Sequence, residues 1–178
     1  GSLSANSIWG NEACVLVGDF LFTKCFCLMV ENGNLRILQT ISRGTTLMAE
    51  GELDELIKTN DLSLTEEGYL SIIARKTGAL ISAAAQIGAI LGNTSDEKEQ
   101  ALTQFGMDVG IAFQLIDDNL DYTSKEEEFG KKIGIDLQDG KITLPLIYTL
   151  SRCSVEETDF IQKTVESEPI SKEDFFRV

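Results

Sequence analysis

Four polar residues in the second half of the chain could hold a metal ion. Gln114, Asp117, Asp118 and Asp121 lie in or at the end of a mostly apolar stretch that contains no proline and that we predict to be helical. Their spacing of i, i+3, i+4 and i+7 places all four on one helix face. Carboxylates one turn apart repel each other, so the pattern favours a bound hard cation, Mg²⁺ or alternatively Mn²⁺.

Two alternative roles for these aspartates carry less weight. An acidic helix end that faces water is the ordinary case, but the apolar neighbours and the glutamine one turn earlier argue for a site. An EF-hand calcium loop is excluded because the sequence pattern that defines it is absent. That pattern consists of regularly spaced oxygen ligands, a central glycine and a later glutamate. We therefore predict a magnesium site at residues 113–121.

The composition narrows the classes of function. The chain has 178 residues, of which 43% are hydrophobic, enough for one domain with a substantial core. The formal net charge of −14 argues against nucleic acid or an anionic membrane surface as a partner. Histidine is absent, which excludes Ser-His-Asp, Cys-His and histidine-ligated zinc chemistry within these 178 residues.

The longest apolar stretch, residues 13–30, predicts a buried core helix. Asp19 and Lys24 interrupt it near the middle, so we do not expect a transmembrane segment. The cysteines form no CxxC pair, and we expect reduced thiols, mostly buried, in a cytoplasmic protein: Cys14, Cys25, Cys27 and Cys153.

The elements that must position the aspartates read as successive helices with short breaks. We predict long helices at about 8–30, 35–59 and 65–91, and a fourth from a capping-box sequence at 94–97 to the aspartates. Residues 123–143 read as a polar loop, and shorter helices begin near 144, 154 and 171. No strand pattern persists. The fold class is all-α, a bundle of long helices around one core.

Two helices carry further signals. The inner face of the second is predicted to comprise Ile37, Ile41, Gly44, Met48, Gly51 and Leu56. The third is rich in glycine and alanine between residues 78 and 92. These small residues either let neighbouring helices approach closely or line an elongated apolar pocket, and the pattern leaves both open.

Four segments together resemble the trans-type polyprenyl diphosphate synthases. Residues 113–121 (FQLIDDNLD) look like that family's second aspartate-rich motif, and residues 130–145 (GKKIGIDLQDGKITLP) look like the lysine-bearing loop after it. Residues 75–78 look like its Lys-Thr pair, and residues 1–21 like the stretch after its first aspartate-rich motif. The order and spacing make the resemblance specific, and the chain has the look of the octaprenyl type that supplies quinone side chains, although its product length cannot be read from these residues.

The resemblance implies an activity and roles for residues. Family members condense an allylic diphosphate with isopentenyl diphosphate, on an all-α isoprenoid synthase bundle that forms a homodimer. By resemblance, Asp117, Asp118 and Asp121 would hold Mg²⁺, and Lys76, Lys131 and Lys141 would bind diphosphate. Thr77 and Gln114 would place oxygen dipoles near the allylic cation; together with Lys76 they form the expected catalytic set. Without the family pattern, each lysine would read as solvent-facing.

Parts of the family pattern do not occur in these 178 residues. The first aspartate-rich motif should precede Gly1, and residues 175–178 read as the middle of a helix. We expect a single helical domain, 1–178, incomplete at its N-terminus and also at its C-terminus, and inactive by itself. The alternatives are a class I terpene synthase and a non-catalytic subunit of a heteromeric synthase.

Overall fold

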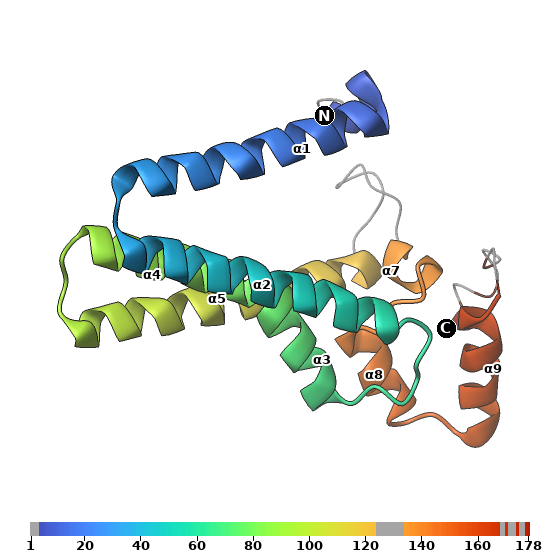
Figure 1. Ribbon diagram of the computed structural model, residues 1–178. Helices are drawn as coiled ribbons and strands as arrows, with labels where there is room; N and C mark the ends of the chain where they lie inside the picture. The colour runs from blue at the N-terminus through green and yellow to red at the C-terminus, as the bar shows by residue number, and fades with distance from the viewer. Residues whose placement is uncertain (1–3, 124–133, 168–169, 171–173, 175–176) are drawn as a thin grey trace.

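The computed structural model describes residues 4–123, 134–167, 170, 174 and 177–178, and within these ranges every regular element is helical (Figure 1). The predicted all-α class is therefore confirmed. The elements are α1 (Ala5–Asn32), α2 (Leu35–Ile57), α3 (Glu66–Ile73), η1 (Ala74–Gly78), α4 (Ala79–Leu91), α5 (Asp96–Thr123), α7 (Ile135–Gln138), α8 (Leu144–Leu150) and α9 (Val155–Val165).

Most helix ends follow the predicted signals. The Thr65 hydroxyl accepts the Gly68 N–H at 3.1 Å at the start of α3. Ser154 and Glu157 form a reciprocal capping box at α9. The capping box predicted at residues 94–97 is wrong, because Ser95 is the residue whose hydroxyl receives a helix N–H, weakly at 3.5 Å, and the donor is Lys98. The predicted loop at 123–143 also contains the short helix α7.

The predicted third helix is one continuous rod with a π turn inside it. α3, η1 and α4 follow each other without a break, and η1 is the five-residue π segment. Tyr69 and Gly78 are nine residues apart, which in a regular α-helix would turn them to opposite sides. The wider π turn instead brings both against α5, where Tyr69 contacts Asp118 and Gly78 lies against Gly110.

The small residues pack helices closely. A Cβ on Gly110 would lie 2.6 Å from the Gly78 Cα, and a Cβ on Gly106 would lie 2.8 Å from the Ser82 Cα. On the other side of α4, a Cβ on Gly44 of α2 would lie 2.9 Å from the Ala83 Cβ. The packing role of the small residues is therefore confirmed.

A separate cluster of buried residues lies in and around α7, α8 and α9. It consists of Leu137, Ile142, Leu146, Ile161 and Val165.

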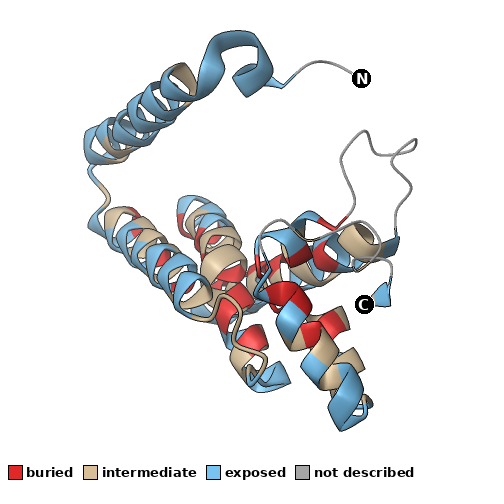
Figure 2. Ribbon diagram, turned by 90° about the vertical axis from the view of Figure 1, so that its right-hand side faces the viewer, coloured by how far each residue is buried: buried red, intermediate tan, exposed pale blue. Residues whose placement is uncertain are grey.

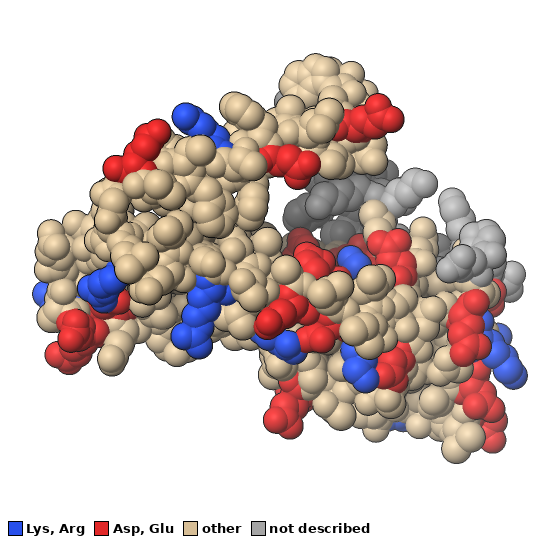
Figure 3. All heavy atoms as spheres, in the orientation of Figure 1, with Lys and Arg blue, Asp and Glu red and all other residues tan. Residues whose placement is uncertain are grey.

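The prediction that residues 13–30 form a buried core helix is wrong within this chain. α1 has no buried residue, because in the described part of the chain it packs against no helix along its length and lies close to α2 only near the turn that joins them (Figures 1 and 2). Most of its surface facing the viewer in Figure 3 is uncharged. By length and composition α1 could cross a membrane, a test that core helices also pass. The four cysteines are free, but none is buried.

The inner face predicted for α2 is partly confirmed. Ile37, Gly44 and Gly51 are buried. Leu56 is 70% exposed, so its assignment to the inner face is wrong. It lies in the last turn of α2.

Candidate functional site

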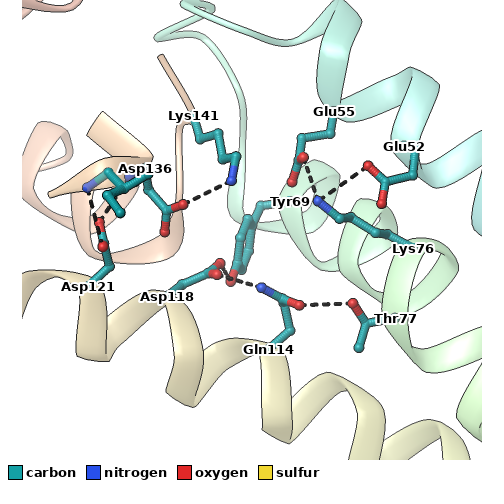
Figure 4. Close-up of polar contacts among 11 residues, drawn as sticks. Glu52, Glu55, Tyr69, Lys76, Thr77, Gln114, Asp118, Asp121, Asp136 and Lys141 are labelled. Atoms are coloured by element: carbon teal, nitrogen blue, oxygen red, sulfur yellow. Dashed lines mark hydrogen bonds and ion pairs between the residues drawn. The ribbon is translucent and has the colours of Figure 1, made fainter. Parts of the chain in front are cut away.

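The site is centred on Asp118, a buried residue near the C-terminal end of α5. Asp118 is only 5% exposed, and both carboxylate oxygens accept hydrogen bonds (Figure 4). The Tyr69 hydroxyl donates to Oδ2 at 2.6 Å, and Gln114 Nε2 donates to Oδ1 at 2.7 Å. Burial raises the pKa of Asp118, against the opposing effect of these two bonds, and the nearby Asp136 and Asp117 carboxylates raise it further.

Gln114 links Asp118 to the Lys-Thr pair. The Thr77 hydroxyl donates to Gln114 Oε1 at 2.8 Å (Figure 4). Thr77 lies in the π turn, and Gln114 lies one turn before Asp118 on α5. The structure thus brings together two motifs that are 37 residues apart in sequence. Because the Thr77 hydroxyl donates its hydrogen bond to Gln114, the lone pairs on the Thr77 oxygen remain available to a positively charged partner.

Asp121 faces α7 rather than open solvent. Its carboxylate accepts the backbone N–H groups of Ile135 at 3.3 Å and Asp136 at 3.0 Å. Burial raises the pKa of Asp121, although these backbone bonds oppose the change. Asp121 therefore fixes the start of α7, and with it Asp136, next to the aspartate-rich end of α5.

Lys141 approaches the same centre from the other side of α7. Its Nζ lies 3.0 Å from Asp136 Oδ1 (Figure 4). Burial opposes the charge on Lys141, but the bond to Asp136 and the surrounding carboxylates outweigh it and raise the pKa. Gly140, immediately before Lys141, has φ +70° and presses against Asn60, whose N–H donates to the Gly140 carbonyl at 2.8 Å. The loop before α3 thus holds Lys141 in place.

Lys76 is paired with acidic residues of α2. Its Nζ lies 2.6 Å from Glu55 Oε2 and 3.4 Å from Glu52 Oε2. The preceding residue, Arg75, pairs with Asp54. A Cβ on Gly51 would collide with the Lys76 backbone, so only glycine lets α2 approach the π turn this closely.

The four polar residues predicted to share a face of α5 do not all turn the same way. Gln114, Asp118 and Asp121 face the helices around them, whereas Asp117 is exposed. The difference arises because adjacent residues on a helix differ by about 100° in direction, and Tyr69 draws Asp118, not Asp117, inward. Lys131 lies outside the described residues.

Known proteins that resemble this chain identify its family. The model of the polyprenyl synthetase family matches residues 1–177. The chain belongs to the polyprenyl synthetase family.

Individual relatives cover the chain but extend well beyond it. Octaprenyl diphosphate synthase of Escherichia coli is 42% identical over 166 residues, which are 93% of this chain and 51% of that protein. A crystal structure of polyprenyl synthase from Caulobacter crescentus, complexed with calcium and isoprenyl diphosphate, is 40% identical with a TM-score of 0.90, covering 99% of this chain and 54% of that one. A decaprenyl diphosphate synthase structure from Rhodobacter capsulatus is 38% identical with a TM-score of 0.88, covering 99% and 55%. The chain thus spans about half the length of these relatives.

The carboxylates of this polyprenyl synthetase chain fit a hard divalent cation by their chemistry. Each oxygen of Asp118 accepts one hydrogen bond and keeps a free lone pair. No three acidic, cysteine or histidine side chains converge on one point in the described part of the chain. The described residues thus form no metal cage of their own, and their carboxylates would suit only an ion such as Mg²⁺, which takes one or two carboxylates and completes its coordination with water and substrate phosphate.

Sequence reasoning missed three residues of this polyprenyl synthetase site. Tyr69, Glu55 and Asp136 each contact a predicted site residue. The signal for Asp136 was available, because it lies in the lysine-bearing segment that carries the family resemblance. Tyr69 gave none, since its approach to Asp118 depends on the π turn.

Proposed function

We propose that the complete protein condenses an allylic prenyl diphosphate with isopentenyl diphosphate. The product would be of medium to long chain, octaprenyl-like, for quinone side chains. The observation that carries the proposal is the chain of hydrogen bonds from Thr77 through Gln114 to Asp118, which joins the Lys-Thr pair to the aspartate-rich motif. Support also comes from the octaprenyl diphosphate synthase of E. coli and from the Caulobacter synthase in complex with calcium and isoprenyl diphosphate.

Residues of this chain would bind the leaving group. Asp117, Asp118 and Asp121 would hold Mg²⁺, or Mn²⁺, beside the allylic diphosphate. When bound, the metal supplies positive charge that stabilises the departing diphosphate. Lys76, Lys131 and Lys141 would add positive charge to the same diphosphate. In a chain of net charge −14, such local positive charge is what an anionic substrate requires.

Thr77 and Gln114 would act on the carbon side of the reaction. The allylic C–O bond breaks and its electron pair leaves with diphosphate, which creates an allylic cation. The Thr77 hydroxyl donates its hydrogen bond to Gln114, so the lone pairs of its oxygen would stabilise this cation. The isopentenyl double bond then supplies the electrons of the new C–C bond. Loss of a proton to diphosphate restores a double bond, so the scheme needs no histidine.

A groove between α2, α4 and α5 would receive the growing chain. It has a volume of about 470 Å³, and its lining combines the apolar residues Leu47 and Met107 and the small residues Gly44, Ala79 and Ala83 with polar side chains, among them Gln39, Arg43 and Gln86. The small residues that pack α4 against α2 thus also border this groove, which would combine the packing role with the pocket role. Its length in the complete protein would set the product length.

The assembly and location follow the same proposal. A homodimer would cover apolar surface of α1, which is exposed here. Asp19 and Lys24 lie within α1 and argue for a protein neighbour rather than a lipid one. A cytoplasmic location is consistent with both inferences.

Product analysis of the complete protein tests this function. It would be incubated with an allylic diphosphate and labelled isopentenyl diphosphate, with Mg²⁺ or with a chelator. The proposal expects labelled polyprenyl diphosphate only in the presence of the metal. A cyclic or unextended product from the allylic substrate alone would instead indicate a terpene synthase. Absence of any product from a folded, metal-loaded protein would contradict the proposal.

A further inference from the structure

We propose that Tyr69 is a positioning residue that fixes the Asp118 carboxylate in the orientation needed to bind a divalent metal. This inference rests on the proposed function. Tyr69 is 3% exposed, and its hydroxyl lies 2.6 Å from Asp118 Oδ2 (Figure 4). A phenol held in the interior at this distance makes a strong, directional bond to a carboxylate.

The Tyr69 bond completes a carboxylate that is held at both oxygens. Gln114 Nε2 donates to Oδ1, and the Gln114 amide is itself oriented by the Thr77 hydroxyl on its Oε1. Together the two donors determine the rotation of the Asp118 carboxylate plane and leave one lone pair on each oxygen. Carboxylates that bind metals commonly depend on such outer partners, whose loss weakens metal affinity by roughly 10- to 100-fold.

Tyr69 also ties this orientation to the Lys-Thr pair. Tyr69 lies on α3 and Thr77 in η1, so one continuous helix provides both contacts to α5, the Tyr69 bond to Asp118 and the Thr77 bond to Gln114. A phenol carries its proton at neutral pH, so Tyr69 is the donor of this bond. The continuous helix of α3 and η1 therefore orients both the proposed metal ligand Asp118 and the proposed cation-stabilising pair, Thr77 and Gln114.

Tyr69→Phe in the complete protein removes the donor and keeps the ring. Tyr122→Phe is the matched control, because Tyr122 lies on the same helix as Asp118 and its buried hydroxyl interacts with Thr143 rather than with a carboxylate. Mn²⁺ binding would be titrated by electron paramagnetic resonance in the presence of a non-reactive allylic thiodiphosphate. We expect Y69F to weaken Mn²⁺ binding about 10-fold, with the KM for isopentenyl diphosphate unchanged, and Y122F to bind Mn²⁺ normally.

The possible results distinguish a failure of the positioning role of Tyr69 from a failure of the proposed function. If the wild-type protein binds Mn²⁺ and Y69F binds it equally well while losing thermal stability, Tyr69 is structural and the inference is overturned. If the wild-type protein binds no metal, the proposed function fails together with the inference.

A second measurement does not require Y69F to fold. Incorporation of 3-fluorotyrosine gives a fluorine resonance for each tyrosine, assigned with single variants, including Y122F for Tyr122. Addition of Mg²⁺ and the thiodiphosphate should shift the Tyr69 resonance more than that of Tyr122. Equal or absent shifts, with the metal bound, would overturn the inference.

Discussion

The ammonium group of Lys76 lies 2.6 Å from Glu55 Oε2, so this expected diphosphate ligand is paired with a carboxylate of α2. Glu52 contributes a second, longer contact at 3.4 Å. A substrate phosphate that binds Lys76 must therefore compete with Glu55. Under the proposed function, Glu55 would therefore help to determine how tightly the allylic diphosphate is held.

The first prediction is that Glu55→Gln tightens binding of the allylic diphosphate. The substitution removes both a competitor for Lys76 and a negative charge near the anion. An interaction of about 1 kcal/mol corresponds to roughly a fivefold lower dissociation constant. Binding of a non-reactive allylic thiodiphosphate would be measured by calorimetry. Glu50→Gln is the control, since Glu50 is exposed on the same helix. Weaker binding in E55Q would mean that Glu55 holds Lys76 in place for the substrate.

The second prediction concerns Lys141, which sequence alone placed in an exposed loop. In the structure its side chain is 31% exposed and pairs with Asp136, which is 15% exposed. Lys141→Gln would leave that carboxylate unpaired, so we expect a loss of about 1 kcal/mol in the free energy of unfolding, in addition to weaker catalysis. Denaturant unfolding measures the first effect and steady-state kinetics the second. Unchanged kinetics with lowered stability would make Lys141 purely structural.

Several parts of the site were predictable from sequence because they depend on local pattern. The helix order, the caps at Thr65 and Ser154, and the aspartates at the end of α5 all follow from spacing and residue type. The pairing of Tyr69 with Asp118 was not predictable, because the π turn changes the helix phase between Tyr69 and Gly78. The exposure of α1 was missed for another reason: an apolar sequence predicts that a helix face is covered, but it does not identify the residues that cover it.

The third prediction tests how the loop before α3 holds Lys141. Gly140→Ala should destabilise the protein by about 1–2 kcal/mol, because φ is +70° and the added Cβ would press on Asn60. Gly88→Ala is the matched control: it lies inside α4 with open space around it and should be neutral or stabilising. Thermal unfolding compares the two variants. Equal stability of G140A and the wild type would show that residue 140 is free to adopt another conformation.

The fourth prediction is a pH dependence from Glu99. This residue joins α2, α4 and α5, because its carboxylate accepts bonds from Gln86 at 3.0 Å and from Arg36 at 2.8 and 2.9 Å. The bond from Gln86, followed by the Arg36 pair, lowers the pKa of Glu99 below its ordinary 4.5, although burial opposes this. The stabilisation is therefore fully present above the unfolded pKa and is lost as the pH falls through the lower folded value.

Glu99→Gln should flatten this acid dependence. Stability measured by urea unfolding between neutral pH and about pH 3 should fall less steeply in E99Q than in the wild type. Glu97→Gln, at an exposed position on the same helix, serves as the control and should retain the wild-type slope. A wild-type slope in E99Q would show that Glu99 does not contribute to acid sensitivity.

Asp117 offers the most direct test of whether the aspartates of α5 hold a divalent metal for prenyl transfer. It is exposed, unlike Asp118, so Asp117→Ala removes a carboxylate with little effect on packing. Asn119→Ala, also exposed on α5, is the control. The measurement is kcat/KM for allylic and isopentenyl diphosphates in the complete protein as a function of Mg²⁺ concentration. We expect a loss of roughly 100-fold or more in D117A, partly recovered at high Mg²⁺, and a wild-type profile in N119A. Metal-independent turnover, or a wild-type Mg²⁺ profile in D117A, would contradict a metal-binding role for these aspartates.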